Sequence, residues 1–189
     1  MTATLALRTE SFPADGPPLE FDAVYAEHFD FVWRNLRRLG VPESCLRDAT
    51  QEVFLVVYRR LEEFVPRGTV RSWLYSILRR VALAQKRQYR LQFPNGTPET
   101  APWVDEAISN PESDAIRGQS LRLLLELLSG LDDDKRDALV SVDLEGMSVP
   151  EACVALEVNI NTLYSRLHAA RRLMRERLAT CPRESRRHL

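Results

Sequence analysis

Residues 145–177 contain the start and stop signals of two helices joined by a tight turn. Ser148 and Glu151 have the spacing of a capping box, in which the two side chains satisfy backbone N–H groups at a helix N-terminus. Asn159 can cap a second, longer helix that is rich in arginine and hydroxyl side chains. This arrangement predicts a helix-turn-helix, whose second helix is suited to the major groove of DNA.

Upstream of this motif, apolar residues recur at steps of three and four, which predicts three amphipathic helices. We expect the first to carry an apolar stripe from Phe21 to Leu36 and to stop near Gly40, the second to span about 43–64, and the third about 69–89. Because their connections are short, the three helices can bury one shared core.

Residues 91–118 combine prolines, an Asn-Gly pair and acidic side chains, which is typical of a linker. Further helices are expected at about 115–129 and 132–144. A connection of this length is unusual inside one compact domain, so two domains are favoured.

We therefore predict an all-α chain, with a three-helix N-terminal bundle and a C-terminal four-helix domain containing the helix-turn-helix, joined by a flexible linker. The predicted boundaries are a disordered tail at 1–17, the N-terminal domain at 18–90, the acidic linker at 91–118, the C-terminal domain at 119–179 and a second tail at 180–189.

Charge is distributed unevenly along the chain, although the net charge is only −1. Residues 21–90 hold 13 basic and 8 acidic side chains, and residues 146–189 hold 8 basic and 4 acidic ones. Residues 91–145, in contrast, hold 4 basic and 12 acidic side chains. Two basic modules around an acidic middle predict two separate contacts with nucleic-acid phosphates.

The sequence offers no pattern for a metal, a cofactor or an enzyme active site. Its three cysteines (Cys45, Cys153 and Cys181) are far apart and share no ligand-like spacing with the three histidines. No apolar run approaches the roughly 20 residues that cross a bilayer, and the N-terminus lacks the features of a signal peptide. We expect a cytoplasmic protein with no cofactor, no metal and no membrane insertion, which is not an enzyme.

The third predicted helix has a basic face opposite its apolar stripe. This face includes Arg71, Tyr75, Arg79, Arg80 and Arg87. Arginines interleaved with aromatic rings suit a single nucleic-acid strand, because guanidinium groups hold phosphates while rings stack on bases. An ordinary solvated face is the alternative for this helix alone.

Four segments resemble those of a known family. Residues 48–54 (DATQEVF) and 71–77 (RSWLYSI) resemble region two of bacterial RNA polymerase sigma factors, and residues 144–148 (LEGMS) and 162–171 (TLYSRLHAAR) resemble their region four. With only these two regions and a short linker, the chain is similar to the extracytoplasmic-function sigma factors. The resemblance covers about residues 20–90 and 118–178.

The resemblance implies functions for both domains. Region two would bind core RNA polymerase and melt the minus-ten element, with Asp48, Gln51, Glu52 and Arg59 as polymerase-binding candidates. Its candidates for the melted non-template strand are Phe64, Arg67, Arg71, Tyr75, Arg79, Arg80 and Arg87, with the segment 64–69 as a pocket for a flipped base. Region four would read the minus-thirty-five element of duplex promoter DNA through Asn161, Thr162, Tyr164, Ser165, Arg166, His168, Arg171 and Arg172. The acidic linker would thread the basic cleft of the polymerase, and an anti-sigma factor is a further expected partner.

Four positions depart from the family pattern. Arg47 stands where an acidic residue is usual, Arg80 replaces an asparagine and Ala84 replaces a common aspartate. Glu157 occupies the turn position often held by glycine, which is tolerated if the turn avoids a left-handed conformation. Two alternatives stay open. One is a helix-turn-helix regulator whose N-terminal bundle dimerises or senses a ligand, and the other, suggested by Arg80, Ala84 and Glu157, is an interaction module that has lost DNA binding.

Overall fold

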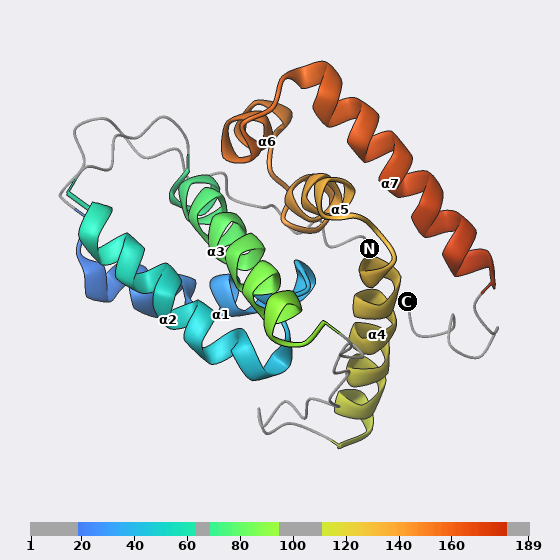
Figure 1. Ribbon diagram of the computed structural model, residues 1–189, viewed down its shortest axis with the longest axis horizontal. Coiled ribbons are helices and arrows are strands. Elements are labelled where there is room, and N and C mark those ends of the chain that lie inside the picture. The colour runs from blue at the N-terminus through green and yellow to red at the C-terminus, as the bar shows by residue number, and fades with distance from the viewer. Residues whose placement is uncertain (1–18, 63–68, 95–110, 181–189) are drawn as a thin grey trace, which may run out of the picture.

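The computed structural model describes residues 19–62, 69–94 and 111–180, with side chains from residue 118 onward in the last range. These residues contain helices and no strands, so the all-α prediction is confirmed for the described part of the chain. The elements are α1 (Phe21–Arg38), α2 (Glu43–Arg60), α3 (Val70–Gln92), α4 (Pro111–Ser129), α5 (Asp133–Leu139), the π-helical turn η1 (Val140–Leu144), α6 (Val149–Leu156) and α7 (Ile160–Thr180), as Figure 1 shows.

Helices α1 to α3 pack on one another as the predicted N-terminal bundle. The side chains of Leu36, Val53 and Leu74, one from each helix, are fully buried between them. Helix α2 ends at Arg60, four residues before its predicted end. Thr69 caps α3 by accepting a hydrogen bond from the Ser72 amide at 3.2 Å.

The C-terminal half contains the predicted helix-turn-helix in α6 and α7. The capping box is present, because the Ser148 hydroxyl and the Glu151 carboxylate each accept from the other's backbone N–H. Asn159 Oδ1 accepts from the Thr162 amide at 2.8 Å and so caps α7. The helix expected at 132–144 is α-helical only to Leu139 and then widens into η1, where the Glu145 amide donates to the Val140 carbonyl at 2.9 Å.

The linker prediction was wrong at both of its ends, since α3 extends to residue 92 and α4 begins at residue 111. A local composition of proline and acidic residues did not prevent α4 from starting, because proline is tolerated in the first turn of a helix. Residues 95–110, and the predicted tails at 1–17 and 181–189, lie outside the described residues.

The two halves pack directly against each other, which the sequence did not predict. Helix α3 lies against α6, and α5 lies between α3 and α7 (Figure 1). Buried apolar side chains of both halves form one continuous cluster. Arg136 of α5 joins the halves, because its Nη1 donates to the Leu39 carbonyl at the end of α1 at 2.8 Å. The same guanidinium donates to the carbonyls of Leu128 at 3.0 Å and Leu131 at 2.9 Å near the end of α4.

Candidate nucleic-acid interface

Helix α7 presents most of the residues predicted to read duplex DNA. Asn161, Tyr164, Ser165, His168, Arg171 and Arg172 are exposed, and Thr162 and Arg166 are half-buried. Tyr164 keeps 52% of its surface exposed although it is aromatic. The opposite face of α7 is apolar and packs on α5 and α6, since Leu163, Leu167 and Ala170 are buried. The predicted recognition residues are thus brought together on one side of a helix-turn-helix.

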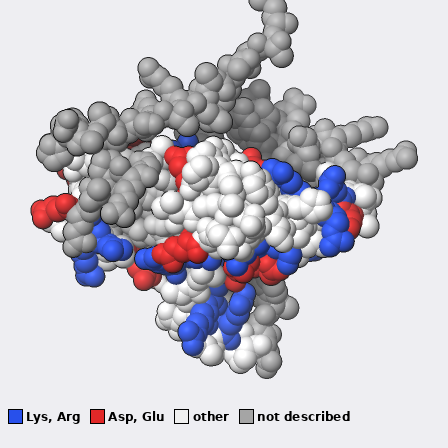
Figure 2. Space-filling model, turned by 90° about the horizontal axis from the view of Figure 1, so that it is seen from above, with Lys and Arg blue, Asp and Glu red and all other residues white. Residues whose placement is uncertain are grey.

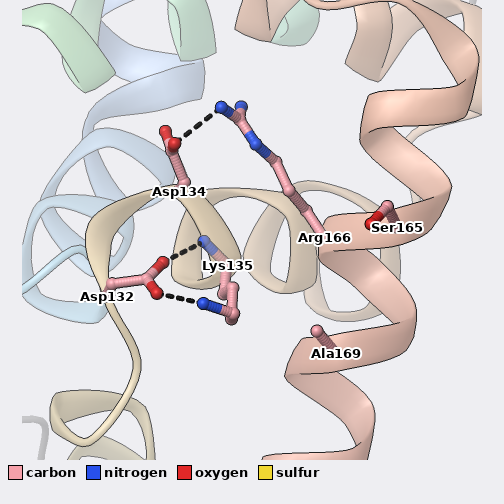
Figure 3. A pocket seen from close by; sticks show the side chains of 6 residues that line it. All are labelled: Asp132, Asp134, Lys135, Ser165, Arg166 and Ala169. Atoms are coloured by element: carbon pink, nitrogen blue, oxygen red, sulfur yellow. Dashed lines mark hydrogen bonds and ion pairs between the residues drawn. The ribbon is translucent and has the colours of Figure 1, made fainter.

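Two arginines of this face are already paired with carboxylates. Arg166 Nη2 donates to Asp134 Oδ2 at 2.6 Å, from the rim of an open pocket of about 310 Å³ between α5 and α7 (Figure 3). Arg171 donates from Nε and Nη2 to the two oxygens of Asp143, at 2.9 and 2.6 Å. This bidentate bond raises the pKa of Arg171 above its usual value. Binding of DNA by either guanidinium group would require it to exchange a carboxylate for a phosphate or a base edge.

The turn between α6 and α7 differs from our expectation. Glu157 has φ 57° and ψ 43°, so the turn is left-handed although the residue is not glycine. The amide of Glu157 donates to the Val154 carbonyl at 3.3 Å, and that of Val158 to the Cys153 carbonyl at 3.0 Å, which ends α6. The helix-turn-helix therefore keeps the geometry that glycine usually provides, at the cost of backbone strain at one residue.

Part of the basic face of α3 meets the C-terminal half. Arg71 Nη2 donates to Glu145 Oε2 at 2.7 Å, Arg79 Nε donates to Asp137 Oδ2, and Arg80 Nη2 donates to Glu157 Oε1. Figure 2 shows acidic and basic side chains next to one another across one face of the molecule. Of the strand-binding candidates on α3, Arg80 and Arg87 are exposed, and Arg71 and Arg79 are half-buried.

The expectation that Tyr75 lies on an exposed face was wrong. Its side chain is 0% exposed, and its hydroxyl donates to the Asp137 carbonyl at 3.3 Å. Burial raises the pKa of Tyr75 well above its usual value, so the hydroxyl stays protonated. Tyr75 is on the predicted side of α3, but α5 covers that side.

The buried charged residues at the contact between the two halves were not identified from the sequence. Asp137 is 2% exposed, and burial raises the pKa of its carboxyl despite the neighbouring Arg79 guanidinium. Burial likewise lowers the pKa of Lys86, whose Nζ donates to the Leu39 carbonyl at 2.8 Å and to Asp133. The opposite charges of residues 21–90 and 91–145 were the signal that could have indicated this contact, because six of the twelve acidic residues of 91–145 lie at 132–145, in or directly beside α5 and η1.

The polymerase-binding candidates lie on α2. Asp48, Gln51 and Arg59 are exposed, while Glu52 is half-buried and accepts from Gln85 Nε2 at 2.8 Å. The same helix exposes two apolar side chains, Leu55 at 47% and Tyr58 at 66%, which suit a protein partner better than solvent does. Between α2 and α3 lies a groove of about 230 Å³, lined by Glu52, Val56, Arg60, Ile77, Arg80, Val81 and Ala84.

The remaining predictions concern the base pocket, metal ligands, membrane spans and cysteines. Phe64 and Arg67, with the predicted base pocket, lie outside the described residues. In the part of the chain that is described, no group of three potential ligands could hold a metal, and no helix is long and apolar enough to cross a membrane. Cys45 and Cys153 are free thiols.

In the comparison with known proteins, each half of the chain matches a family model. Residues 24–91 match the family "Sigma-70 region 2", and residues 121–174 match "Sigma-70, region 4". The ECF RNA polymerase sigma factor SigE of Mycolicibacterium smegmatis is 32% identical over 162 residues, which cover 84% of this chain and 62% of that protein. The RNA polymerase sigma factor CnrH of Cupriavidus metallidurans is 28% identical over 169 residues, covering 84% of this chain and 86% of CnrH.

Solved structures show the same fold. CnrH in complex with the cytosolic domain of CnrY has a TM-score of 0.63 at 23% identity, and the similarity covers 89% of this chain and 94% of CnrH. The sigma factor RpoE of Bartonella quintana, in complex with the anti-sigma factor NepR, has a TM-score of 0.68 at 18% identity, covering 86% and 98% of the two chains. Both sigma regions are present in the expected order. The chain therefore belongs to the extracytoplasmic-function family of RNA polymerase sigma factors, the proteins that direct the polymerase to specific promoters.

Proposed function

We propose that the two halves of this sigma factor divide promoter recognition between them. The C-terminal half, residues 119–179, reads the minus-thirty-five element with the exposed face of α7. The N-terminal half, residues 18–90, binds core RNA polymerase through α2 and holds the melted minus-ten strand through α3. The polymerase performs the chemistry in the cytoplasm, and this chain contributes binding free energy.

The exposed face of α7 is the observation that supports this proposal most directly. Polar and aromatic side chains follow one another along a capped helix whose apolar side is fixed on α5 and α6. Side chains on such a helix can reach base edges in the major groove, while arginines farther along it hold phosphates. Tyr164 and Ser165 are exposed, so both side chains are accessible to a ligand.

Residues on α2 support the polymerase contact. Gln51 and Arg59 each stand four residues from the exposed Leu55 of α2, so they lie on the same side of the helix, and Asp48 and Tyr58 are exposed as well. A partly apolar patch with a charged rim is typical of a protein–protein interface. We further infer that an anti-sigma protein binds this chain, because two solved relatives are complexes, one of them with an anti-sigma factor.

The proposal is tested by transcription with purified core polymerase, after mapping the transcript starts that this chain directs. Arg166→Ala should weaken binding to the minus-thirty-five duplex by about 1–3 kcal/mol if Arg166 reads a base. Arg122→Ala, an exposed arginine of α4, is the matched control and should leave binding unchanged. Failure to bind core polymerase would refute the proposal, and binding of duplex DNA by a dimer without polymerase would favour the regulator instead.

A further inference from the structure

Three arginines of the N-terminal half converge on one carboxylate of the C-terminal half. Glu145 follows η1, and only 2% of its side-chain surface is exposed. Arg38 Nη1 donates to Glu145 Oε1, Arg71 Nη2 donates to Oε2 at 2.7 Å, and Arg34 Nε lies 3.6 Å from Oε1. The Glu145 carboxylate is therefore bound by three guanidinium groups from helices α1 and α3.

One carboxylate does not neutralise this cluster. Guanidinium groups remain protonated in proteins, so three positive charges face one negative charge. Within the described residues, the buried Nε of Arg38 has no hydrogen-bond acceptor. The cluster thus has both charge and donors left for further anionic oxygens.

The geometry of the cluster suits a phosphate. Planar guanidinium groups bind carboxylates and phosphates through similar paired hydrogen bonds, so the Glu145 carboxylate occupies a position that a phosphate can take. The Arg71 guanidinium is held in place because its Cζ lies 4.8 Å from the centre of the Phe31 ring. Arg34 and Arg38 come from one helix and are four residues apart, so they face the same side.

The position of the cluster indicates which phosphate it binds. Arg71 lies in the first turn of α3, the helix that also bears Arg79 and Arg80. A single strand that follows these arginines along α3 reaches Arg34 and Arg38 next to Arg71. A nucleic-acid strand is therefore favoured over an acidic peptide as the ligand.

We propose that Arg34, Arg38 and Arg71 form a phosphate site for the melted promoter strand, and that Glu145 fills this site when the two halves of the chain are closed together. The strand and the closed arrangement compete for the same three arginines. Separation of the halves releases the site, together with Arg79 and Arg80, which pair with Asp137 and Glu157 in the closed arrangement. This inference rests on the proposed function for the nature of its ligand.

The test is binding of the full chain to a labelled oligothymidylate of about 15 nucleotides, measured by fluorescence anisotropy over a range of salt concentrations. Glu145→Gln should tighten binding, by about tenfold if the closed form outweighs the open form by roughly ten to one. Adding Arg34→Gln and Arg38→Gln to this variant should weaken binding and lower the slope of log K against log salt by about 0.7 for each lost phosphate contact.

Control variants separate the site from general charge effects. Arg47→Gln removes an exposed arginine of α2, and Glu126→Gln removes an exposed carboxylate of α4. Neither should reproduce the affinity changes of the Arg34, Arg38 and Glu145 variants. Arg34→Gln alone changes a half-exposed side chain, so it keeps the test valid if the combined variant does not fold.

Either of two outcomes would overturn the proposal. An unchanged salt slope for the arginine variants would show that they bind no phosphate, and an unchanged affinity for Glu145→Gln would show that this carboxylate does not compete. Loss of core-polymerase binding with unaltered oligonucleotide binding would assign the arginines to a protein contact instead. The anisotropy measurement needs no polymerase, so it tests the phosphate site separately from the proposed function. If the variants change oligonucleotide binding as expected but the wild-type chain directs no transcript, the proposed function is refuted and the phosphate site is retained.

Discussion

Replacing Glu157 with glycine separates backbone strain from charge in the helix-turn-helix. Glu157 has φ 57° and ψ 43°, a conformation that costs a residue with a Cβ atom about 1–2 kcal/mol. Glycine avoids this cost but loses about 0.5–1 kcal/mol through the greater freedom of its unfolded state. The backbone contribution of Glu157→Gly is therefore a net stabilisation of about 0–1.5 kcal/mol, with a midpoint near 0.75 kcal/mol.

The same substitution removes the ion pair with Arg80, which opposes this gain. The two side chains are 56% and 62% exposed, so the pair contributes only about 0.2–1 kcal/mol and is screened by salt. Glu157→Gly should therefore raise the free energy of unfolding most clearly near 1 M salt, where the screening length is about 3 Å. Glu157→Gln is the matched control, since it removes the charge but keeps the strain.

Urea unfolding of the full chain, followed by far-ultraviolet circular dichroism at low and high salt, measures both effects. Glu157→Gln should lose stability only at low salt. A destabilised Glu157→Gly variant at high salt would refute the strain argument. Since glycine adopts the same backbone conformation, the affinity for minus-thirty-five duplex should not change, and a loss would mean that the Glu157 side chain has a DNA-binding role.

Three further changes test the fold. Ser148→Ala should lower the free energy of unfolding by about 1 kcal/mol, and Ser148→Asp should preserve it, as measured by urea unfolding. Arg136→Met should lower it by about 3 kcal/mol or more, because the carbonyls of Leu39, Leu128 and Leu131 each lose a hydrogen bond from the guanidinium; a value near zero would contradict the bridging role. Burial lowers the pKa of His28, so the folded state binds fewer protons than the unfolded state and stability should fall as the pH drops below about 6.5. His28→Gln should flatten this dependence between pH 7 and pH 5, and an unchanged pH profile would show that His28 is not its source.

The local features of the helix-turn-helix could be predicted from the sequence because they depend on neighbours in the chain. The capping box of Ser148 and Glu151 and the Asn159 cap each join residues three positions apart. The faces of α7 follow from helical periodicity in the same way. The handedness of the turn at Glu157 did not, because a glutamate gives no sign that its backbone will be left-handed.

The contact between the halves could not be predicted from periodicity. Arg71, Tyr75 and Arg79 recur at steps of four, which places them on one side of α3 but does not say what that side meets. Tyr75 is buried where α5, some 60 residues later in the chain, lies against it, and its hydroxyl donates to the Asp137 carbonyl. Arg136 likewise binds carbonyls at the ends of two helices that only the folded chain brings together.

Acidic residues between Asp133 and Glu145 form ion pairs with arginines of the N-terminal half and with arginines of α7. The two sets of pairs respond differently when the halves separate. Arg166 and Arg171 of α7 are bound by Asp134 and Asp143 from their own half, so separating the halves leaves these pairs intact. The pairs made by Asp137 and Glu145 cross between the halves and are lost on separation. We therefore expect opening to strengthen binding to the single strand far more than binding to the minus-thirty-five duplex. We expect the free chain to keep α7 accessible to duplex DNA while Glu145 and Asp137 hold Arg38, Arg71 and Arg79, so that these three arginines can contact a melted strand after the halves have separated.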